Sequence, residues 1–403
     1  MFKLNRLSKR MIILLAAVSA LGPVGMQILL PALPVIKQKF YVTNDVAQLT
    51  LSLSMLAIAI GTLVYGPLSD KFGRKRVMLV GIVITIFGSI VCFVADSIML
   101  LISGRFIQAF GGAVGLVLAR AIVRDVYGPE EAARVIATLV MVMVVLPMMS
   151  PALGGELMQR FGFESVFIVI AFASAIAFVF LFLWLPETLA KPVPFEGVKS
   201  MLMTFSKLFA SRVFCGYAFC VTFVSVVFFS FISAAPEIMV SVLKRPPTEY
   251  GYYFIMIPAG FMIGNYVARH YGRTISIDNM IAIGASIGVF GIVLALMLQT
   301  LGMSSPVALF LPIALAVFGN GITLPNAQAA AINEFPEYAG TASGLTGFLQ
   351  MAVSSVAAQA VALIFNGTVY PLLGLMLVAS IISLLIFRWG VLNFKKKNNL
   401  EKD

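Results

Sequence analysis

A dense group of charged side chains lies in the segment Gly66–Val77, which reads GPLSDKFGRKRV. Asp70 and Arg74 are four residues apart, so on a helical turn they point the same way. Gly66 and Gly73 permit a tight reversal of the backbone between two helices. The segment offers no enzymatic arrangement of groups, and its predicted chemistry is that of ion pairs that hold a loop.

The composition of the surrounding chain is typical of a membrane protein. Of its 403 residues, 60% are hydrophobic and only 11% are charged, and the mean hydropathy is +1.01. A spanning helix needs roughly 20 apolar residues, and about twelve such runs occur between charged or Pro/Gly breaks. Abundant Gly and Phe, 33 of each, favour closely packed helices over a barrel of alternating strands. We therefore predict an all-α polytopic membrane protein with about 12 transmembrane helices.

The longest polar interruption runs from Pro186 to about Arg212 and divides six predicted spans from six. We predict an N-terminal six-helix bundle at 1–190, a cytoplasmic linker at 191–211, and a C-terminal six-helix bundle with a short basic tail at 212–403. Halves of equal span number suggest duplication, with a substrate path between them. A weak echo of the first loop follows the eighth span, where Arg269 stands at the place of Asp70.

The net charge of +11 is distributed by topology instead of being gathered on one face. This asymmetry predicts cytoplasmic termini and argues against a nucleic-acid partner. The basic start is expected to lead into an uncleaved first helix. The expected inner side carries Lys3, Arg6, Lys9, Arg10, Lys71, Arg74, Lys75, Arg76, Arg124, Arg134, Lys191, Lys199, Lys207, Arg212, Arg269, Arg273, Arg388 and Lys395 to Lys397, whereas the outer side carries Lys37, Lys39, Arg160, Lys244 and Arg245.

Neither a metal site nor a cofactor is indicated. The three cysteines all lie in apolar helix, and the single histidine, His270, is expected to be a solvated residue at a helix end. No cluster of His, Cys and carboxylate groups occurs in or beside the predicted spans, so we expect no enzymatic activity.

Three motifs occur in an order that resembles the major facilitator superfamily. Gly66–Val77 resembles the signature loop between the second and third helices of that family. Arg105–Gln108, followed by Gly111 and Gly112, resembles the fourth-helix motif of its proton-coupled members. Ser150–Gly155, preceded by Pro147, resembles the fifth-helix motif of antiporters, although Ser150-Pro151 stands where the family has Gly-Pro.

Further motifs are spread over essentially the whole chain, at Leu30–Pro34, Arg124–Tyr127, Pro186–Thr188, Ser233–Pro236, and Glu334–Pro336 with Ala339–Ser343. They resemble the bicyclomycin- and chloramphenicol-resistance group of bacterial drug:proton antiporters. This resemblance implies a proton-coupled exporter of drugs or small metabolites that works by alternating access in the bacterial inner membrane. We expect a monomer, with the lipid bilayer and a small-molecule substrate as partners.

The resemblance also implies roles for the charged loop. In the family, the acid and base of the signature loop and an acid on the fourth helix hold the inner gate closed. These roles fall on Asp70, Arg74 and Asp125, with Gly66 and Gly73 shaping the turn. Contacts of this kind bias conformational states and perform no bond chemistry.

Two residues are expected to line the cavity in its outer half. Gln27 lies about 24 Å along the first span from its inner end, and Arg105 about 10 Å along the fourth from its outer end. Relatives carry an acid where this chain has Gln27, and a glutamine does not titrate, so proton coupling is not simply inherited. An arginine at this depth is expensive and points to function.

Two questions follow from the missing acid. Glu237, after the seventh span, is either a solvated carboxylate near the cavity mouth or a relocated proton site. A retained Arg105 leaves the cavity more positive, which suits an anionic metabolite or siderophore, exported or imported with altered or absent proton coupling. Further polar side chains that we expect to bind cargo are Gln108, Asn320, Asn326 and Gln328.

Overall fold

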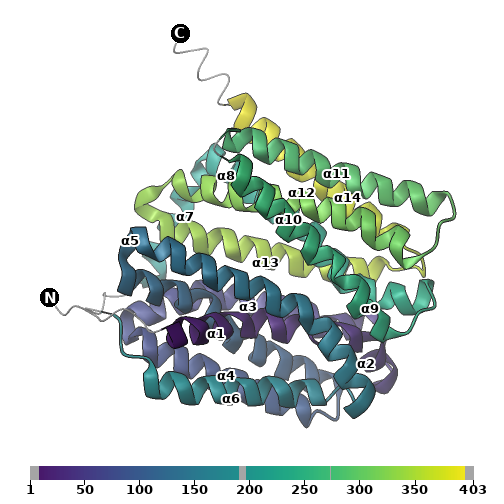
Figure 1. Cartoon of the computed structure of the whole chain (residues 1–403), viewed down its shortest axis with the longest axis horizontal. Helices are drawn as coiled ribbons and strands as arrows, with labels where there is room; N and C mark the ends of the chain where they lie inside the picture. The colour runs from purple at the N-terminus through teal and green to yellow at the C-terminus, as the bar shows by residue number, and fades with distance from the viewer. Residues whose placement is uncertain (1–8, 190–196, 273, 395–403) are drawn as a thin grey trace. The chain divides into compact units, whose positions relative to one another are not determined.

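A computed structural model of the chain describes residues 9–189, 197–272 and 274–394, and no strand occurs among them. The chain forms two compact units, Met1–Phe195 and Glu196–Asp403, each of which is described by itself (Figure 1). The predicted basic clusters at 1–8 and 395–403 lie outside the described residues, as does Arg273.

The first unit is a bundle in which α5 packs against α1, α3 and α4, and α6 packs against α4. Small residues allow the backbones to approach closely, because a Cβ on Gly112 would lie 3.0 Å from the Gly22 Cα and one on Gly81 would lie 2.6 Å from the Val114 Cβ. Its helices are α1 (Lys9–Gln27), the 3-10 turn η1 (Leu30–Ala32), α2 (Leu33–Lys39), α3 (Asn44–Phe72), α4 (Arg74–Phe93), α5 (Ile98–Phe161) and α6 (Ser165–Trp184).

Helix α5 contains a reversal of direction. Its 64 residues would extend about 96 Å if they were straight. Gly112 packs on Gly22 of α1, whereas Gly154 packs on the carbonyl of Ile28, only six residues further along the chain. Forty-two residues of straight helix would separate Gly112 from Gly154 by about 63 Å, so the chain folds back between them. The α5 region therefore supplies both the fourth and the fifth predicted spans.

The second unit is a bundle in which α8 packs against α12, α13 and α14, while α12 packs against α10 and α11. A buried cluster around Phe214, Tyr217 and Phe387 joins α8 to α14. The helices are α7 (Gly197–Ala210), α8 (Arg212–Glu237), the π-helical turn η2 (Ile238–Val242), α9 (Pro247–Phe254), α10 (Met256–Tyr271), α11 (Ile277–Thr300), α12 (Pro306–Asn333), the 3-10 turn η3 (Pro336–Tyr338), α13 (Ala339–Ile364), α14 (Tyr370–Phe387) and the π-helical turn η4 (Arg388–Leu392).

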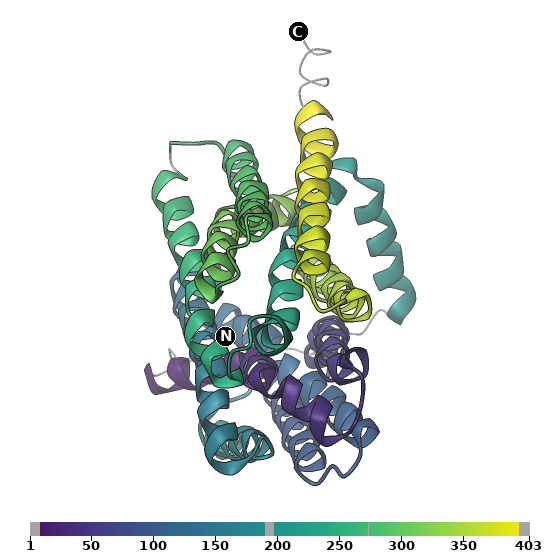
Figure 2. The same cartoon turned by 90° about the vertical axis from the view of Figure 1, so that its right-hand side faces the viewer.

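Helix α7 falls within the linker predicted at 191–211. It packs against α8 and α13, where Leu208 is fully buried, and Figure 2 shows it at the periphery of the second unit. Leu202 and Met203 on the same helix are exposed. Its role as a cytoplasmic linker stays a prediction.

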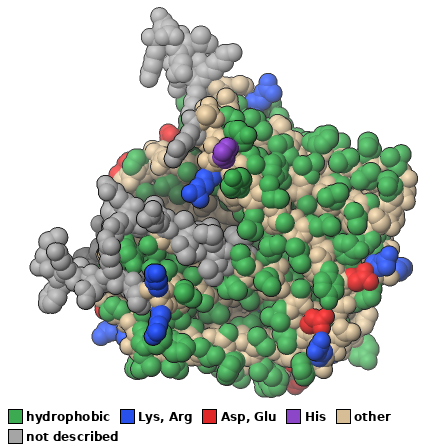
Figure 3. All heavy atoms as spheres, in the orientation of Figure 1, with side chains coloured by type: hydrophobic (Ala, Val, Ile, Leu, Met, Phe, Trp, Pro, Cys, Tyr) green, Lys and Arg blue, Asp and Glu red, His purple; other side chains and the backbone are tan. Residues whose placement is uncertain are grey.

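Ten segments among the described residues are long and apolar enough to cross a membrane. Ile98–Tyr127 of α5 is one of these ten segments. The eighth predicted span is not among them, because it is divided at Ile255 into α9 and α10, neither of which is long enough alone. Hydrophobic side chains dominate the surface visible in Figure 3, as lipid contact requires. His270 is exposed, as predicted.

Candidate functional site

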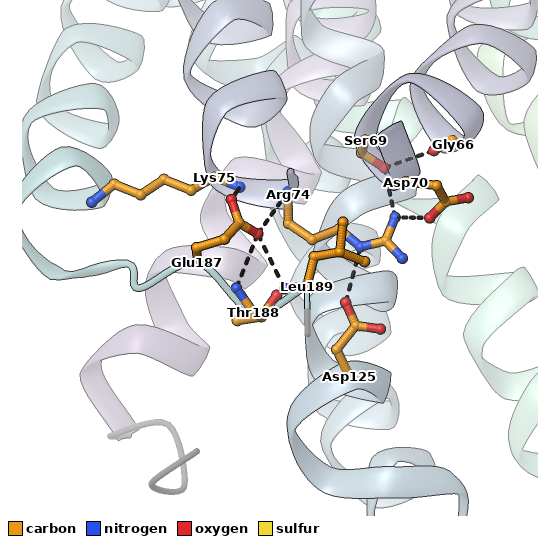
Figure 4. Close-up of polar contacts among 9 residues, drawn as sticks. All are labelled: Gly66, Ser69, Asp70, Arg74, Lys75, Asp125, Glu187, Thr188 and Leu189. Atoms are coloured by element: carbon orange, nitrogen blue, oxygen red, sulfur yellow. Dashed lines mark hydrogen bonds and ion pairs between the residues drawn. The ribbon is translucent and has the colours of Figure 1, made fainter. Parts of the chain in front are cut away.

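Arg74 stands at the centre of an ionic network at one end of the first unit (Figure 4). Its Nη1 lies 2.6 Å from Asp70 Oδ1, one turn earlier in the sequence, and its Nε lies 2.9 Å from Asp125 Oδ2 on α5. The same Nη1 donates to the Ser69 hydroxyl at 2.6 Å. The guanidinium thereby ties the end of α3, the start of α4 and the middle of α5 together.

Glu187, just after α6, completes this network. Its carboxylate accepts from the backbone N–H of Arg74 at 2.8 Å and from that of Lys75 at 3.2 Å. These are donors of the first turn of α4, where a helix leaves N–H groups without internal partners and where its dipole favours negative charge. The carboxylate also accepts from the N–H groups of Thr188 and Leu189. The Glu187 carboxylate is therefore the N-terminal cap of α4.

The turn between α3 and α4 depends on Gly73. Its φ of +98° lies in a region that side chains disfavour. A Cβ on Gly73 would also come within 3.0 Å of the Glu187 Cδ. Gly66 differs, because a Cβ on it would meet nothing within 4 Å, so the structure gives it no steric requirement there.

A second polar group lies within the spans of the first unit, around Arg105. This side chain is 1% exposed, and its Nη1 donates to the Gly25 carbonyl of α1 at 3.0 Å and to the Gln108 side-chain oxygen. Gln108 in turn donates to the Ser89 hydroxyl of α4 at 2.7 Å. All the acceptors of Arg105 are neutral, and its Nε has no partner among the described residues. Arg105 is thus a buried cation without a carboxylate in its contacts.

The structure joins only some of the predicted cavity residues. Arg105 and Gln108 are in contact, whereas Gln27 is buried and the guanidinium reaches the carbonyl of Gly25, two residues before it.

In the second unit, the amide of Asn320 donates to the Val224 carbonyl of α8 at 3.2 Å. Asn326 donates to the Ile322 carbonyl within its own helix, and Gln328 is half-buried on the same helix. These bonds hold helices and leave the predicted cargo contacts of the three residues untested.

Glu237 ends α8 and is 7% exposed. The solvated carboxylate that was one of two interpretations of this residue is therefore wrong. Counting residues along a helix placed it near a mouth, but η2 continues the helical chain beyond it and keeps Ile238 and Met239 buried.

The second unit lacks an Arg74-like network among its described residues. Arg269, at the place of Asp70 in the echo of the loop, is exposed. Nearby helices are joined instead by a bond from the Tyr217 hydroxyl to Asp278 at 2.5 Å.

No group of three or more His, Cys, Asp or Glu residues that could hold a metal occurs in the part of the chain described.

Two helical units, with many spanning helices and an ionic network at the loop between α3 and α4, define a polytopic transporter. The profile of the Major Facilitator Superfamily matches residues 15–358, and the chain belongs to that family. The resemblance and the all-α polytopic class predicted from sequence are confirmed. The protein is therefore a multi-pass membrane transporter of small molecules and not an enzyme.

Similar proteins extend over nearly the whole chain. A bicyclomycin resistance protein homolog of Haemophilus influenzae is 28% identical over 383 residues, covering 93% of this chain and 94% of the relative. Multidrug resistance protein D of Escherichia coli strain K12 is 27% identical over 377 residues, covering 91% and 94%.

Solved structures agree in fold. A bacterial homolog of the human lysosomal transporter Spinster, in an inward-facing and occupied conformation, has a TM-score of 0.74 at 14% identity, covering 96% of this chain and 97% of that one.

Glu187 is the residue of the network that sequence reasoning missed. Pro186–Thr188 was noted only as a group motif and as the end of a hydrophobic run. The sequence did contain a signal. The third span begins with backbone N–H groups that no preceding side chain caps, and an acid lies directly after the sixth span.

Proposed function

We propose that the protein is a proton-coupled exporter of drugs or small metabolites that works by alternating access as a monomer in a bacterial inner membrane, with both termini in the cytoplasm. The observation that carries this proposal is the Arg74 network at the signature loop of a family member. The names of the relatives, which refer to bicyclomycin and multidrug resistance, support drugs as the cargo.

The network acts in this proposal as the latch of the inner gate. Asp70, Arg74 and Asp125 are held by short ion pairs, and Glu187 fixes the helix that carries Arg74. A latch must break in one state, and partly exposed ion pairs are suited to this because each contributes only about 0–1 kcal/mol. Gly73 allows the turn that presents Arg74 to both acids, and Gly66 lies at the start of the same loop.

The experiment is flux in proteoliposomes with an imposed pH gradient, using bicyclomycin, chloramphenicol and a lipophilic cation as cargo. We expect saturable flux that follows the gradient and that weakens in Asp70→Asn without loss of membrane insertion. Flux that ignores the pH gradient would refute proton coupling, and wild-type flux in Asp70→Asn would refute the latch.

A second candidate is transport of an anionic metabolite or siderophore with altered coupling. The observation that favours it is the buried Arg105, whose contacts are all neutral in a chain with Gln27 in place of the acid of its relatives. An anion can supply the charge-assisted hydrogen bonds that this guanidinium lacks. Competition between anionic and cationic cargoes in the same vesicles separates the two candidates, because a preference for cations refutes the second.

For either candidate function, we consider one acid of the second unit as the group that couples transport to protons. Glu237 is a buried carboxylate on the helix that also contacts Asn320. We propose that it carries the proton that Gln27 cannot. An unchanged dependence of flux on pH in Glu237→Gln would exclude this assignment.

A further inference from the structure

Helix α5 carries two more arginines that neither the latch nor the Arg105 group uses. Arg120 and Arg124 fall within the segment Ile98–Tyr127, which is apolar enough to span a membrane. Arg120 lies 15 residues beyond Arg105, or about 22 Å along the helix. Arginines at such positions are expensive and are normally paired with acids or backbone carbonyls.

Among the described residues, neither of these arginines is paired with an acid or a backbone carbonyl. The Nε of Arg120 is buried and has no hydrogen-bond partner among the described residues. Arg124, one helical turn later, is exposed, and no hydrogen bond or ion pair to it is found in the described part of the chain. The adjacent acid, Asp125, is bound to Arg74. Two cations at positions i and i+4 of one helix repel each other, so an anion between them would remove both the repulsion and the missing contacts.

Helix α3 packs beside α5 and carries a further buried polar group, Tyr65. Ser54 Oγ contacts the Arg105 carbonyl at 3.5 Å, and a Cβ on Gly61 would lie 2.6 Å from the Ala113 Cβ. These two contacts show that α3 and α5 run side by side in the same direction. Tyr65 is one turn beyond Gly61, on the same side of α3.

The hydroxyl of Tyr65 is likewise buried without a partner among the described residues. Its ring, however, packs against that of Phe110 with 5.2 Å between the centroids, and its Cε2 lies 3.3 Å from where a Cβ of Gly61 would be. Arg120 is ten residues beyond Phe110, or about 15 Å along α5, so the Tyr65 hydroxyl lies outside the arginine pair.

We propose that Arg120 and Arg124 form a binding site for a carboxylate or phosphate group near the latch end of the first unit. Guanidinium groups bind both anions through paired, charge-assisted hydrogen bonds. The inference rests on the proposed function in that the anionic group belongs to cargo. It extends that function by placing a recognition site for anions about 22 Å along α5 from Arg105.

The test uses the full chain purified into nanodiscs of phosphatidylcholine. Citrate and inorganic phosphate are titrated, with sodium chloride at equal ionic strength as reference, and binding is followed by calorimetry and by thermal unfolding. We expect saturable binding of citrate or phosphate. Arg120→Gln should weaken it about tenfold or more, because bonds from charged donors are the stronger ones, and the change of the exposed Arg124 to Gln should weaken it less. Tyr65→Phe, which removes a hydroxyl outside the pair, should leave it unchanged.

Two further variants define the chemistry. Arg120→Lys keeps a point charge without the planar fork and should retain part of the affinity. Arg160→Gln is the matched control, since Arg160 lies near the far end of α5 and is exposed and paired with Glu156. Its affinity should equal that of the wild type.

Nanodiscs that contain phosphatidylglycerol separate a lipid headgroup from a soluble anion as the ligand. A headgroup that fills the site would abolish the phosphate titration in these discs only. Undiminished titration there assigns the site to soluble cargo.

The proposal is overturned if the wild type binds neither anion more than chloride, or if Arg120→Gln binds as tightly as the wild type. Should Arg120→Gln fail to fold, Arg124→Gln decides, and unchanged affinity in that exposed variant overturns the proposal. Anion binding without flux in proteoliposomes refutes the transport proposal and leaves the site, whereas flux without anion binding refutes the site alone.

Discussion

Two arginines of the first unit, Arg74 and Arg105, are both largely buried, and their partners differ in kind. Arg74 binds two carboxylates and a hydroxyl at the start of α4. Arg105 binds a backbone carbonyl and an amide oxygen within the spans. A cation whose charge is neutralised contributes to the fold, whereas a buried cation that meets only neutral acceptors is expensive for the fold. The comparison therefore separates an arginine that holds helices together from one retained for another purpose.

The largest expected effect concerns Arg105→Met. Replacing a buried charge by an apolar side chain of similar length is often neutral or stabilising, so the melting temperature should remain within about 3 °C of the wild type. Flux should fall about tenfold or more, because the charge is what this side chain supplies to cargo.

Flux in proteoliposomes and thermal unfolding of the same preparation check this prediction. Arg105→Lys is the control that keeps the charge, and it should retain part of the flux. A large loss of stability in Arg105→Met with normal flux per folded molecule would make Arg105 a structural residue like Arg74.

Arg74→Met should show the opposite pattern. It leaves Asp70 and Asp125 unpaired and removes the donor to Ser69, so we expect a loss of about 1–3 kcal/mol of stability. The exposed fractions of the two acid side chains, 42% and 23%, place the effect toward the lower end of this range.

Chemical or thermal unfolding in detergent micelles measures this loss, and Arg76→Met, which changes an exposed basic residue of the same loop, is the matched control. Equal stability of the two variants would show that the ion pairs of Arg74 contribute nothing measurable to the fold.

The difference between the two arginines also shows what the sequence predicts and what it does not. The Asp70–Arg74 pair follows from their spacing, and the contact of Arg105 with Gln108 has the i,i+3 spacing of helical neighbours. Asp125 came from the family resemblance. Glu187 came from neither, since it reaches the backbone of Arg74 across 113 residues and no local pattern encodes that contact.

The depth of individual side chains and the continuity of the helices were harder to predict than the presence of the helices. The twelve apolar runs predict the helices, but hydropathy does not indicate that Pro247–Tyr271 breaks at Ile255. Glu237 was placed near the cavity mouth by counting residues along an ideal helix, but it is buried, at the point where α8 continues into a π-helical turn. Tertiary contacts of this kind are absent from a linear count.

Gly73→Ala tests whether the site around Arg74 depends on the backbone conformation of the turn as well as on the ion pairs. The positive φ disfavours alanine, and the new Cβ would press on Glu187, so we expect a loss of about 1–2 kcal/mol. Gly66→Ala is the control in the same loop, because open space surrounds that position. Thermal unfolding of both variants checks this prediction. Equal stability would show that the turn accommodates the alanine without a measurable loss of stability.

The smallest effect extends the comparison to a third cation, Lys39, which is 44% exposed and bridges α2 to Glu164 before α6. Partial burial acts to raise the pKa of Glu164, but the hydrogen bond and charge of Lys39 outweigh it and lower that pKa overall.

A carboxyl whose pKa is lower in the folded than in the unfolded protein stabilises the fold fully above the unfolded value of about 4.3, and this stabilisation is lost as pH falls through the folded value. The pair should contribute about 0–1 kcal/mol at pH 7. Wild type and Glu164→Gln should therefore differ slightly in melting temperature at pH 7 and converge below about pH 4. A difference that persists or grows in acid would mean that Glu164 contributes through packing and not through its charge.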